Sequence, residues 1–462
     1  MDPVLLGEIF SALMFFGVIG MLMLGFPVAF TLAGTSLIFA FVGSHFGVFD
    51  FSNFSALAGR YTGFMTNEVL VAVPLFIFMG VMLERSRIAE QLLMTMSKLF
   101  GNLRGGLGMS VIVVGALLAA STGVVGATVV TMGLISLPAM LRAGYDPRLA
   151  SGVICASGTL GQIIPPSTVL IFMADMLAGI NAQVQMSQGN FAPDPVSVGD
   201  LFAGAFIPGL LLVGLYLLWM VFKAFTDPES CPATPLTNDE RKRLFKEVFV
   251  ALVPPLLLIM AVLGSILGGI ATPTEAASVG AVGAMALAGL RWKLSWAVLK
   301  EAVVATATIT SMIFIIIFGA SVFAIVFRQM GGDALVHEFL SGMPGGAIGA
   351  MIVVMMIMFV LGFILDTFEI IFIVIPITAP ILLTLGLDPV WLGVMVGVNL
   401  QTSFLTPPFG FSLFYLRGVA PAHVSTGQIY QGALPFVVLQ IIAIALLFIF
   451  PELVTWLPKQ LY

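Results

Sequence analysis

The stretch of sequence that decides the fold runs from residue 149 to residue 175 and reads LASGVICASGTLGQIIPPSTVLIFMAD. It is apolar and long enough to cross a bilayer, but its centre holds two glycines followed by the pair Pro165 and Pro166. Each proline removes an amide donor and pushes the residue before it out of the helical conformation, so a helix breaks here. In lipid the freed carbonyl groups need a cation, water or buried polar groups as partners. The segment therefore indicates a discontinuous membrane helix.

The composition also indicates a membrane protein. The 462 residues are 60% hydrophobic and 9% charged, whereas soluble proteins carry about 25% charged residues. The bilayer must therefore replace water over much of the surface. A net charge of −5 without a long Lys/Arg run gives no sign of nucleic-acid binding. The two cysteines and three histidines are too scattered for a disulfide framework or a metal site, and no hydrolase motif is present. We therefore expect no enzyme, no catalytic residues and no cofactor.

Breaking the chain at polar and Gly/Pro clusters predicts eight membrane spans and two longer, interrupted apolar regions, 107–175 and 346–416. The spans lie near 6–24, 26–44, 67–84, 201–222, 248–269, 273–290, 301–327 and 428–450. An amphipathic segment, 87–103, is expected either in the cytoplasmic interface or as a plain connecting helix. The polar segment 226–240 marks the boundary between two halves.

The distribution of basic residues predicts the orientation, because cytoplasmic loops are enriched in Lys and Arg. One arrangement places 15 of the 18 basic residues inside and leaves only Arg60, Arg328 and Lys459. Both termini then lie outside, as does the segment 178–200, which has no Lys or Arg. The charges do not decide whether 109–141 and 346–387 are re-entrant hairpins or pairs of full spans.

An internal repeat appears when the chain is shifted by 242 residues. The form I-x-x-P-x-x-L-x-x-G-x-D-P at 135–147 recurs at 377–389, and the Pro165-Pro166 pair falls on Pro407-Pro408. The charge map gives the copies opposite orientations, since basic residues flank only the first G-x-D-P. Inverted repeats with broken helices are common in secondary transporters, and their sites lie where the discontinuous helices meet.

Polar residues gather where each half is expected to combine a hairpin tip with a broken helix. The first tip is predicted at Ser121-Thr122-Gly123 and the second at Asp366-Thr367. Carbonyl and hydroxyl oxygens at such points suit a monovalent cation, although single Ser and Thr residues also serve as contacts between helices. Glu369 is either a functional intramembrane carboxylate or one solvated at the tip. Glu275 fits a helix N-terminus, where its charge is favourable.

Several of these motifs resemble the large membrane subunit of the tripartite ATP-independent periplasmic (TRAP) transporters. The resemblance rests on Gly269 to Ala276 (GIATPTEA), the run at 376–389, Asn399-Leu400 with 405–410 (LTPPFG), and 161–167 (GQIIPPS). It implies an all-α polytopic membrane protein of the elevator type. Two inverted-topology repeats would each contribute a re-entrant helical hairpin and a broken transmembrane helix to a mobile transport domain, beside a static scaffold.

The resemblance also implies a sodium ion in each half and a substrate between them. Carried over by position, the sodium ligands are Ser121, Thr122, Gly126, Thr159, Gln162 and Pro165 in the first half, and Asp366, Thr367, Thr402, Thr406 and Pro407 in the second. The substrate residues are Thr122, Gln162, Ser167, Gln401, Thr402 and Ser403. No metal other than sodium, the coupling ion, is expected.

The expected domain organisation follows from these assignments. Residues 1–106 form N-terminal scaffold spans with an interfacial arm, 107–177 the first hairpin and broken helix, and 346–418 the second hairpin and broken helix. Residues 178–345 hold the outer loop, central scaffold spans, the cytoplasmic linker 226–247 and a second arm. Residues 419–462 form the C-terminal span.

The predicted function is sodium-coupled uptake of a small organic anion, a carboxylate or a sulfonate, across the bacterial inner membrane. The resemblance implies a periplasmic substrate-binding protein and a separate small membrane subunit of about four helices as partners, in a transporter built on inverted repeats. One alternative is a sodium/dicarboxylate symporter that needs no binding protein. Another is an ion-translocating subunit of an energy-conserving complex, which the lack of basic residues in the membrane core disfavours.

Overall fold

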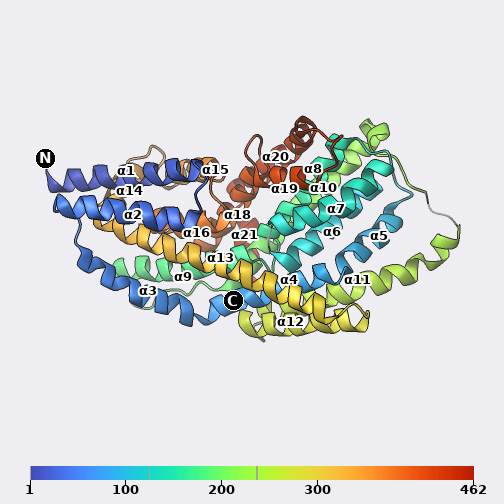
Figure 1. Ribbon diagram of the computed structural model, residues 1–462, viewed down its shortest axis with the longest axis horizontal. Coiled ribbons are helices and arrows are strands. Elements are labelled where there is room, and N and C mark those ends of the chain that lie inside the picture. The colour runs from blue at the N-terminus through green and yellow to red at the C-terminus, as the bar shows by residue number, and fades with distance from the viewer. Residues whose placement is uncertain (1, 124, 236–237) are drawn as a thin grey trace. The chain divides into compact units, whose positions relative to one another are not determined.

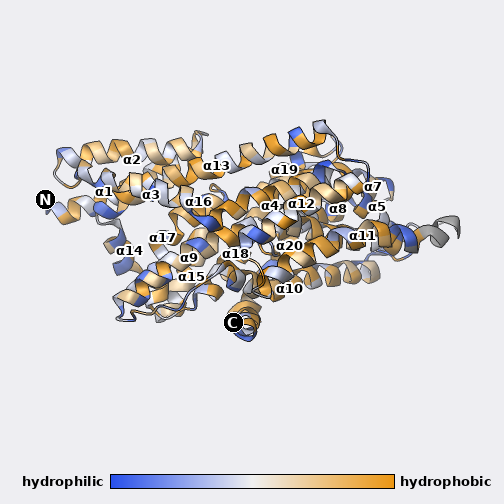
Figure 2. Cartoon of the chain, turned by 90° about the horizontal axis from the view of Figure 1, so that it is seen from below, coloured by the Kyte–Doolittle hydropathy of each residue, from blue (hydrophilic) through white to orange (hydrophobic). Residues whose placement is uncertain are grey.

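The computed structural model describes residues 2–123, 125–235 and 238–462, without the side chains of residues 89, 121, 122, 238–243 and 245. The described residues form α-helices and three short 3-10 helices with no β-strand, which confirms the predicted all-α fold. Eight described helices are long and apolar enough to cross a membrane, or up to ten if each of two bent pairs is one span. Figure 2 shows that hydrophobic residues dominate these helices, while hydrophilic residues gather at helix ends and in connections.

The chain divides into two compact units, and the boundary between them falls inside the helices α4, α9, α13 and α18. The first unit holds residues 1–70, 172–197 and 308–392. Its helices are α1 (Pro3–Met23), α2 (Val28–His45), η1 (Phe51–Phe54), α3 (Ser55–Thr66), parts of α9 (Thr168–Ser187) and α13 (Trp296–Gln329), α14 (Gly332–Ser341), α15 (Gly346–Leu361), α16 (Thr367–Ile373) and α17 (Ile375–Thr384).

The second unit holds residues 71–171, 198–307 and 393–462. Its helices are α4 (Glu68–Arg85), α5 (Ile88–Phe100), α6 (Gly106–Thr122), α7 (Val125–Arg142), α8 (Pro147–Thr159), η2 (Leu160–Gln162), α10 (Val198–Thr226), η3 (Pro228–Ser230), α11 (Asn238–Leu267), α12 (Pro273–Leu290), α18 (Pro389–Leu405), α19 (Phe411–Val419), α20 (Thr426–Ile449) and α21 (Glu452–Leu461). Within this unit α8 packs against α6, α7 and α20 (Figure 1).

The repeated G-x-D-P motif has a local structural reason in both halves. Gly144 and Gly386 have φ of +85° and +92°, a left-handed conformation that ends the preceding helix at little cost only for glycine. The carboxylate of Asp146 accepts a hydrogen bond from the Arg148 amide at 2.7 Å, and that of Asp388 accepts one from the Trp391 amide at 2.8 Å. Each aspartate therefore caps the next helix, which begins at the proline.

The helix bounds follow the same register as the sequence repeat. A shift of 242 residues carries the bounds of α7, 125–142, onto 367–384, the span of α16 and α17 together. The first residue of α8, Pro147, falls on the first residue of α18, Pro389. The helix boundaries are therefore consistent with an internal repeat.

Both interrupted regions contain the breaks that the sequence predicts. The first breaks between η2 and α9 at residues 163–167, and the second between α18 and α19 at residues 406–410. The turn between α6 and α7 includes Gly123, at a φ of +61°, and the second hairpin turns at residues 362–366. In the second hairpin α16 and α17 meet at an angle of 58°.

The prediction of a loop over 178–200 is wrong for residues 178–187 and 198–200, because α9 continues to Ser187 and α10 begins at Val198. The remaining residues fold back onto this helix through amide side chains. Asn181 donates to the Asp194 carbonyl at 2.8 Å, and the Gln185 side-chain oxygen accepts from the Asp194 amide at 2.9 Å. These bonds let the polar end of α9 remain helical.

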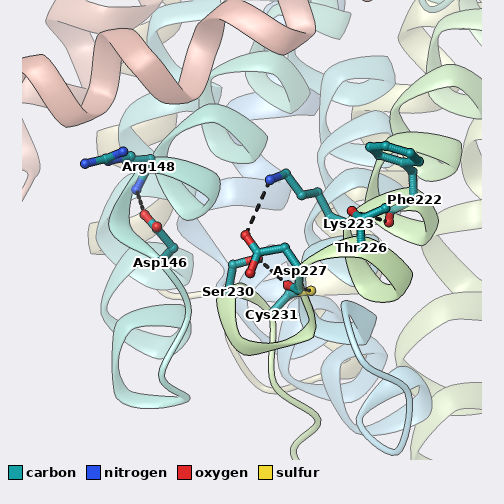
Figure 3. Close-up of polar contacts among 8 residues, drawn as sticks. All are labelled: Asp146, Arg148, Phe222, Lys223, Thr226, Asp227, Ser230 and Cys231. Carbon is teal, nitrogen blue, oxygen red and sulfur yellow. Dashed lines mark hydrogen bonds and ion pairs between the residues drawn. The ribbon is translucent and has the colours of Figure 1, made fainter.

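The polar linker after α10 is held against the loops of the first hairpin (Figure 3). Lys223 forms an ion pair with Asp227 at 3.5 Å, and the hydroxyl of Ser230 donates to the Asp227 carbonyl at 2.7 Å. The Ser230 carbonyl accepts from the Asp146 amide at 2.9 Å, and Thr234 donates to the Gly101 carbonyl at 2.7 Å. The segment 227–234 is therefore fixed by hydrogen bonds to the loops before and after the first hairpin.

Candidate functional site

The tip of the first hairpin contacts the chain just after the first helix break. The hydroxyl of Thr168, the first residue of α9, donates to the carbonyl oxygen of Gly123 at 3.1 Å. A side chain at Gly123 would collide with Thr168, so glycine is required for this close approach as well as for its left-handed φ. Hairpin tip and helix break therefore meet at one point in the second unit.

A cluster of buried, uncharged polar side chains surrounds the two breaks in the second unit. Its centre is the hydroxyl of Tyr216 on α10, which accepts a hydrogen bond from the Gln440 amide at 2.8 Å and lies 3.5 Å from the Gln401 amide nitrogen. Thr159, at the end of α8, donates from its hydroxyl to the Ala156 carbonyl at 2.9 Å. All four side chains are fully buried. The Tyr216 hydroxyl thus joins α10 to the second broken helix and to the C-terminal span.

Of the other predicted substrate residues, Gln162, Ser167, Thr402 and Ser403 are also buried, and the side chain of Thr122 lies outside the described residues. Ser167 donates from its hydroxyl to the Gln162 carbonyl at 3.0 Å, which closes the first break. In the second half, the hydroxyls of Thr402 and Ser403 donate to carbonyls of their own helix at 2.8 Å, and Thr406 does so at 2.7 Å. Each hydroxyl oxygen keeps lone-pair capacity for a further partner.

Two oxygens of the cluster lack a hydrogen-bond partner among the described residues. They are the side-chain oxygens of Gln401 and Gln440, and both are buried. A buried amide oxygen without a partner costs about 1–3 kcal/mol, so such atoms call for a ligand. Neutral, hard oxygen atoms of this kind suit a sodium ion or the hydroxyl of a bound solute. The donor set at the breaks therefore fits the predicted cation chemistry.

Three more predicted sodium ligands belong to the second unit. Gly126 lies near the start of α7 against the ring of Tyr415, Pro165 is buried at the first break, and Pro407 is partly exposed at the second. The side chains of Ser121 and Thr122 lie outside the described residues.

Asp366 and Thr367 belong to the first unit and open α16. The Asp366 carboxylate accepts from the Thr367 amide at 2.7 Å, and the Glu369 carboxylate accepts from the Asp366 amide at 2.9 Å. Together the two carboxylates form a capping box. Glu369 is only 4% exposed, so the reading of a solvated carboxylate at the tip is wrong. A capping role accounts for the position of both acids.

Two members of the polar cluster, Tyr216 and Gln440, were not predicted from the sequence. Each is a single polar residue within an apolar span, in LLLVGLYLLWMV and PFVVLQIIAIALL. Both residues could have been singled out from the sequence, because polar residues inside membrane helices usually have a specific partner or function. Each was missed because its span contains neither a break nor a charge.

Similarity to known proteins is found over nearly the whole chain. The family described as "Tripartite ATP-independent periplasmic transporter, DctM component" matches residues 15–453. A relative in Vibrio cholerae, the C4-dicarboxylate TRAP transporter large permease protein DctM, is 31% identical over 97% of this chain and 98% of its own length. The isethionate TRAP transporter permease protein DctMQ of Oleidesulfovibrio alaskensis is 27% identical over 80% of this chain and 55% of its own.

A solved structure shows the same fold. The crystal structure of the Alcanivorax borkumensis YdaH transporter superimposes with a TM-score of 0.60, covering 99% of this chain and all of that one, at 15% identity. The resemblance seen in the proline-containing breaks thus extends to sequence and fold along the full length. This chain belongs to the family of the DctM component, the large permease of tripartite ATP-independent periplasmic transporters.

Proposed function

We propose that this chain carries out sodium-coupled uptake of a small organic anion across the bacterial inner membrane by an elevator movement. The observation that carries the proposal is the buried cluster of hydroxyl and amide groups at the two helix breaks. It contains no charged side chain among the described residues, yet it leaves two amide oxygens without partners. Bound sodium would supply the positive charge that lets such a neutral site accept an anion.

The chain's own residues have separable tasks in this proposal. The amide nitrogens of Gln401 and Gln440 are held by Tyr216, which turns their oxygens away from it. The Thr406 hydroxyl donates to the Thr402 carbonyl in the last turn of α18, which supplies one carbonyl at the break with a partner other than water. The Thr168–Gly123 bond keeps the first hairpin tip against this region.

The partners and the substrate class follow from the relatives. One relative is named for C4-dicarboxylates and another for isethionate, so carboxylates and sulfonates are the substrate classes proposed. We expect a periplasmic binding protein to deliver the anion and a separate small membrane subunit of about four helices to complete the permease, with both termini in the periplasm.

The test is uptake of labelled organic acids into proteoliposomes that contain this chain, its small membrane subunit and its binding protein. Uptake should require both a sodium gradient and the binding protein. Thr402→Ala should lower it at least tenfold, since it removes a buried hydroxyl at the break. The matched control is Thr384→Ala, which removes an exposed hydroxyl bonded in the same way to its own helix. Sodium-driven uptake by this chain alone would replace the proposal with the self-sufficient symporter.

A further inference from the structure

A cavity of about 510 Å³ lies within the first unit. Its wall is formed by α3, α9 and α13, and by Phe372 and Pro376 of the second hairpin. This volume is within the range of cavities that hold small-molecule ligands. The polar side chains on the wall are Arg60, Asn67, Asp175, Gln183, Ser321 and Arg328.

The two arginines on this wall are unusual for their side of the membrane. They are two of the three basic residues that the charge map leaves off the cytoplasmic side. Both also line a second cavity of about 380 Å³ in the same unit. Positive charge on the outer side is thus concentrated at one place.

Arg60 has no hydrogen bond or ion pair with any described residue, although it is partly buried and the like charge of Arg328 acts on it. A guanidinium group offers five N–H donors and stays protonated. Removing such a group from water next to a second cation is unfavourable unless an anion compensates. The donors of Arg60 are therefore available to bind an anion.

Arg328 is held in place by two neighbours. Its Nε lies 3.1 Å from the Asp333 carboxylate, and its Nη2 donates to the Pro376 carbonyl at 3.0 Å. Burial raises the pKa of Asp333, and the charge of Arg328 offsets this rise only in part. The contact with Pro376 fixes the guanidinium at the wall that the second hairpin contributes.

Asp175 gives the cavity a second chemical feature. One of its carboxylate oxygens accepts from the Asn67 side chain at 2.7 Å, and Asn67 in turn caps α4 by accepting from the Val69 amide at 2.9 Å. The carboxyl group can pair with a hydroxyl in either protonation state, and in its ionised form it repels a second carboxylate. Asp175 forms no ion pair with either arginine among the described residues, so these groups offer separate contacts.

We propose that this cavity binds a hydroxylated monocarboxylate, with its carboxylate on Arg60 and Arg328 and a hydroxyl on Asp175. The cavity is then an outer vestibule, where an anion rests beside the second hairpin before it reaches the helix breaks. The vestibule role depends on the proposed function and orientation, whereas the binding itself does not.

The experiment measures binding to the purified chain by thermal shift, in choline chloride without sodium. The probes are gluconate, a hydroxylated monocarboxylate, succinate, a dicarboxylate, and sorbitol, which is neutral. Gluconate should raise Tm, succinate should do so less, and sorbitol should not. Arg60→Gln should weaken gluconate binding at least tenfold, and it should fold normally because Arg60 makes no bond. Asp175→Asn should reduce the preference for gluconate over succinate.

The control is Lys459→Gln, which removes the third outer basic residue without touching the cavity and should leave gluconate binding unchanged. The proposal is overturned if no carboxylate shifts the wild-type Tm, if Arg60→Gln binds as wild type does, or if Lys459→Gln weakens binding equally. Sodium is absent, so these outcomes are independent of coupled uptake. Failure of uptake with binding intact would reject the proposed function alone.

Discussion

At the scale of single residues, the hydroxyl of Tyr216 matters for both stability and the candidate site. It is the shared partner of two buried glutamines that come from α18 and α20. In a membrane interior a single polar contact of this kind contributes about 0.6 kcal/mol on average and up to about 1.7 kcal/mol. Besides this contribution to stability, the Tyr216 hydroxyl orients the two glutamine side chains.

Tyr216→Phe should therefore lower both thermal stability and substrate affinity. The change leaves the Gln440 amide buried without its acceptor, which costs about 1–3 kcal/mol. We expect a lower Tm and a raised KM for sodium-driven uptake. Tyr462→Phe is the control, because its side chain is exposed and its hydroxyl donates to the Ile266 carbonyl at 3.3 Å, outside the polar cluster, and there both quantities should change little. Equal effects of the two variants would contradict an orienting role.

The role of a single residue could be predicted where the residues that determine it lie close together in the sequence. Glu275 was placed correctly at a helix N-terminus, because Thr272 and Glu275 form a capping box around Pro273, the first helical residue. The same capping pattern at Asp366 and Glu369 was not recognised: Asp366 was predicted as a sodium ligand, and Glu369 as either a functional or a solvated carboxylate. Tyr216 and Gln440 are 224 residues apart, and no local pattern reveals such a partner.

At the scale of elements, α8 and α20 approach each other closely. Gly152 of α8 faces the Gly432 carbonyl, and Gly432 of α20 faces the Arg148 carbonyl. A β-carbon at either glycine would overlap the opposing backbone. Small residues that let backbones approach closely are typical of membrane helix pairs.

Gly152→Ala should destabilise the fold by about 1–3 kcal/mol, because the added methyl group must push the two backbones apart. The measurement is Tm in detergent, with monodispersity on size exclusion as a second readout. Gly214→Ala in α10 is the matched control, since a β-carbon there meets nothing within 4 Å. That variant should be neutral or more stable by about 0.5 kcal/mol. Similar losses in both variants would argue against the glycine contact.

Most elements could be predicted because the length and hydropathy of a membrane span are visible in the sequence. The span expected near 26–44 is α2 at Val28–His45, and the span expected near 273–290 is α12. The helices α3 and α21 were missed, because both mix apolar with polar residues and α3 is set off from α4 by a 53° bend. The end of α9 was missed because Asn and Gln there bond to the following loop rather than to water.

At the scale of the whole molecule, the proposed sodium sites predict a salt-specific stabilisation. A ligand that binds only the folded state at ten times its Kd adds about 1.4 kcal/mol. Tm should therefore be higher in sodium chloride than in potassium chloride at equal ionic strength. Thr402→Ala should reduce this difference, and Thr384→Ala should preserve it. Equal Tm values in the two salts would contradict sodium binding to the isolated chain.

The contact between Gly152 and Gly432 also bears on which parts can travel together. Backbones interlocked at two carbonyls neither slide nor rotate past each other without separating, and the Tyr216–Gln440 bond fastens α10 to the same pair. In the proposed elevator movement, a displacement of the first helix break would therefore carry α20 and α10 with it. The moving body would then include the last membrane span as well as the broken helices.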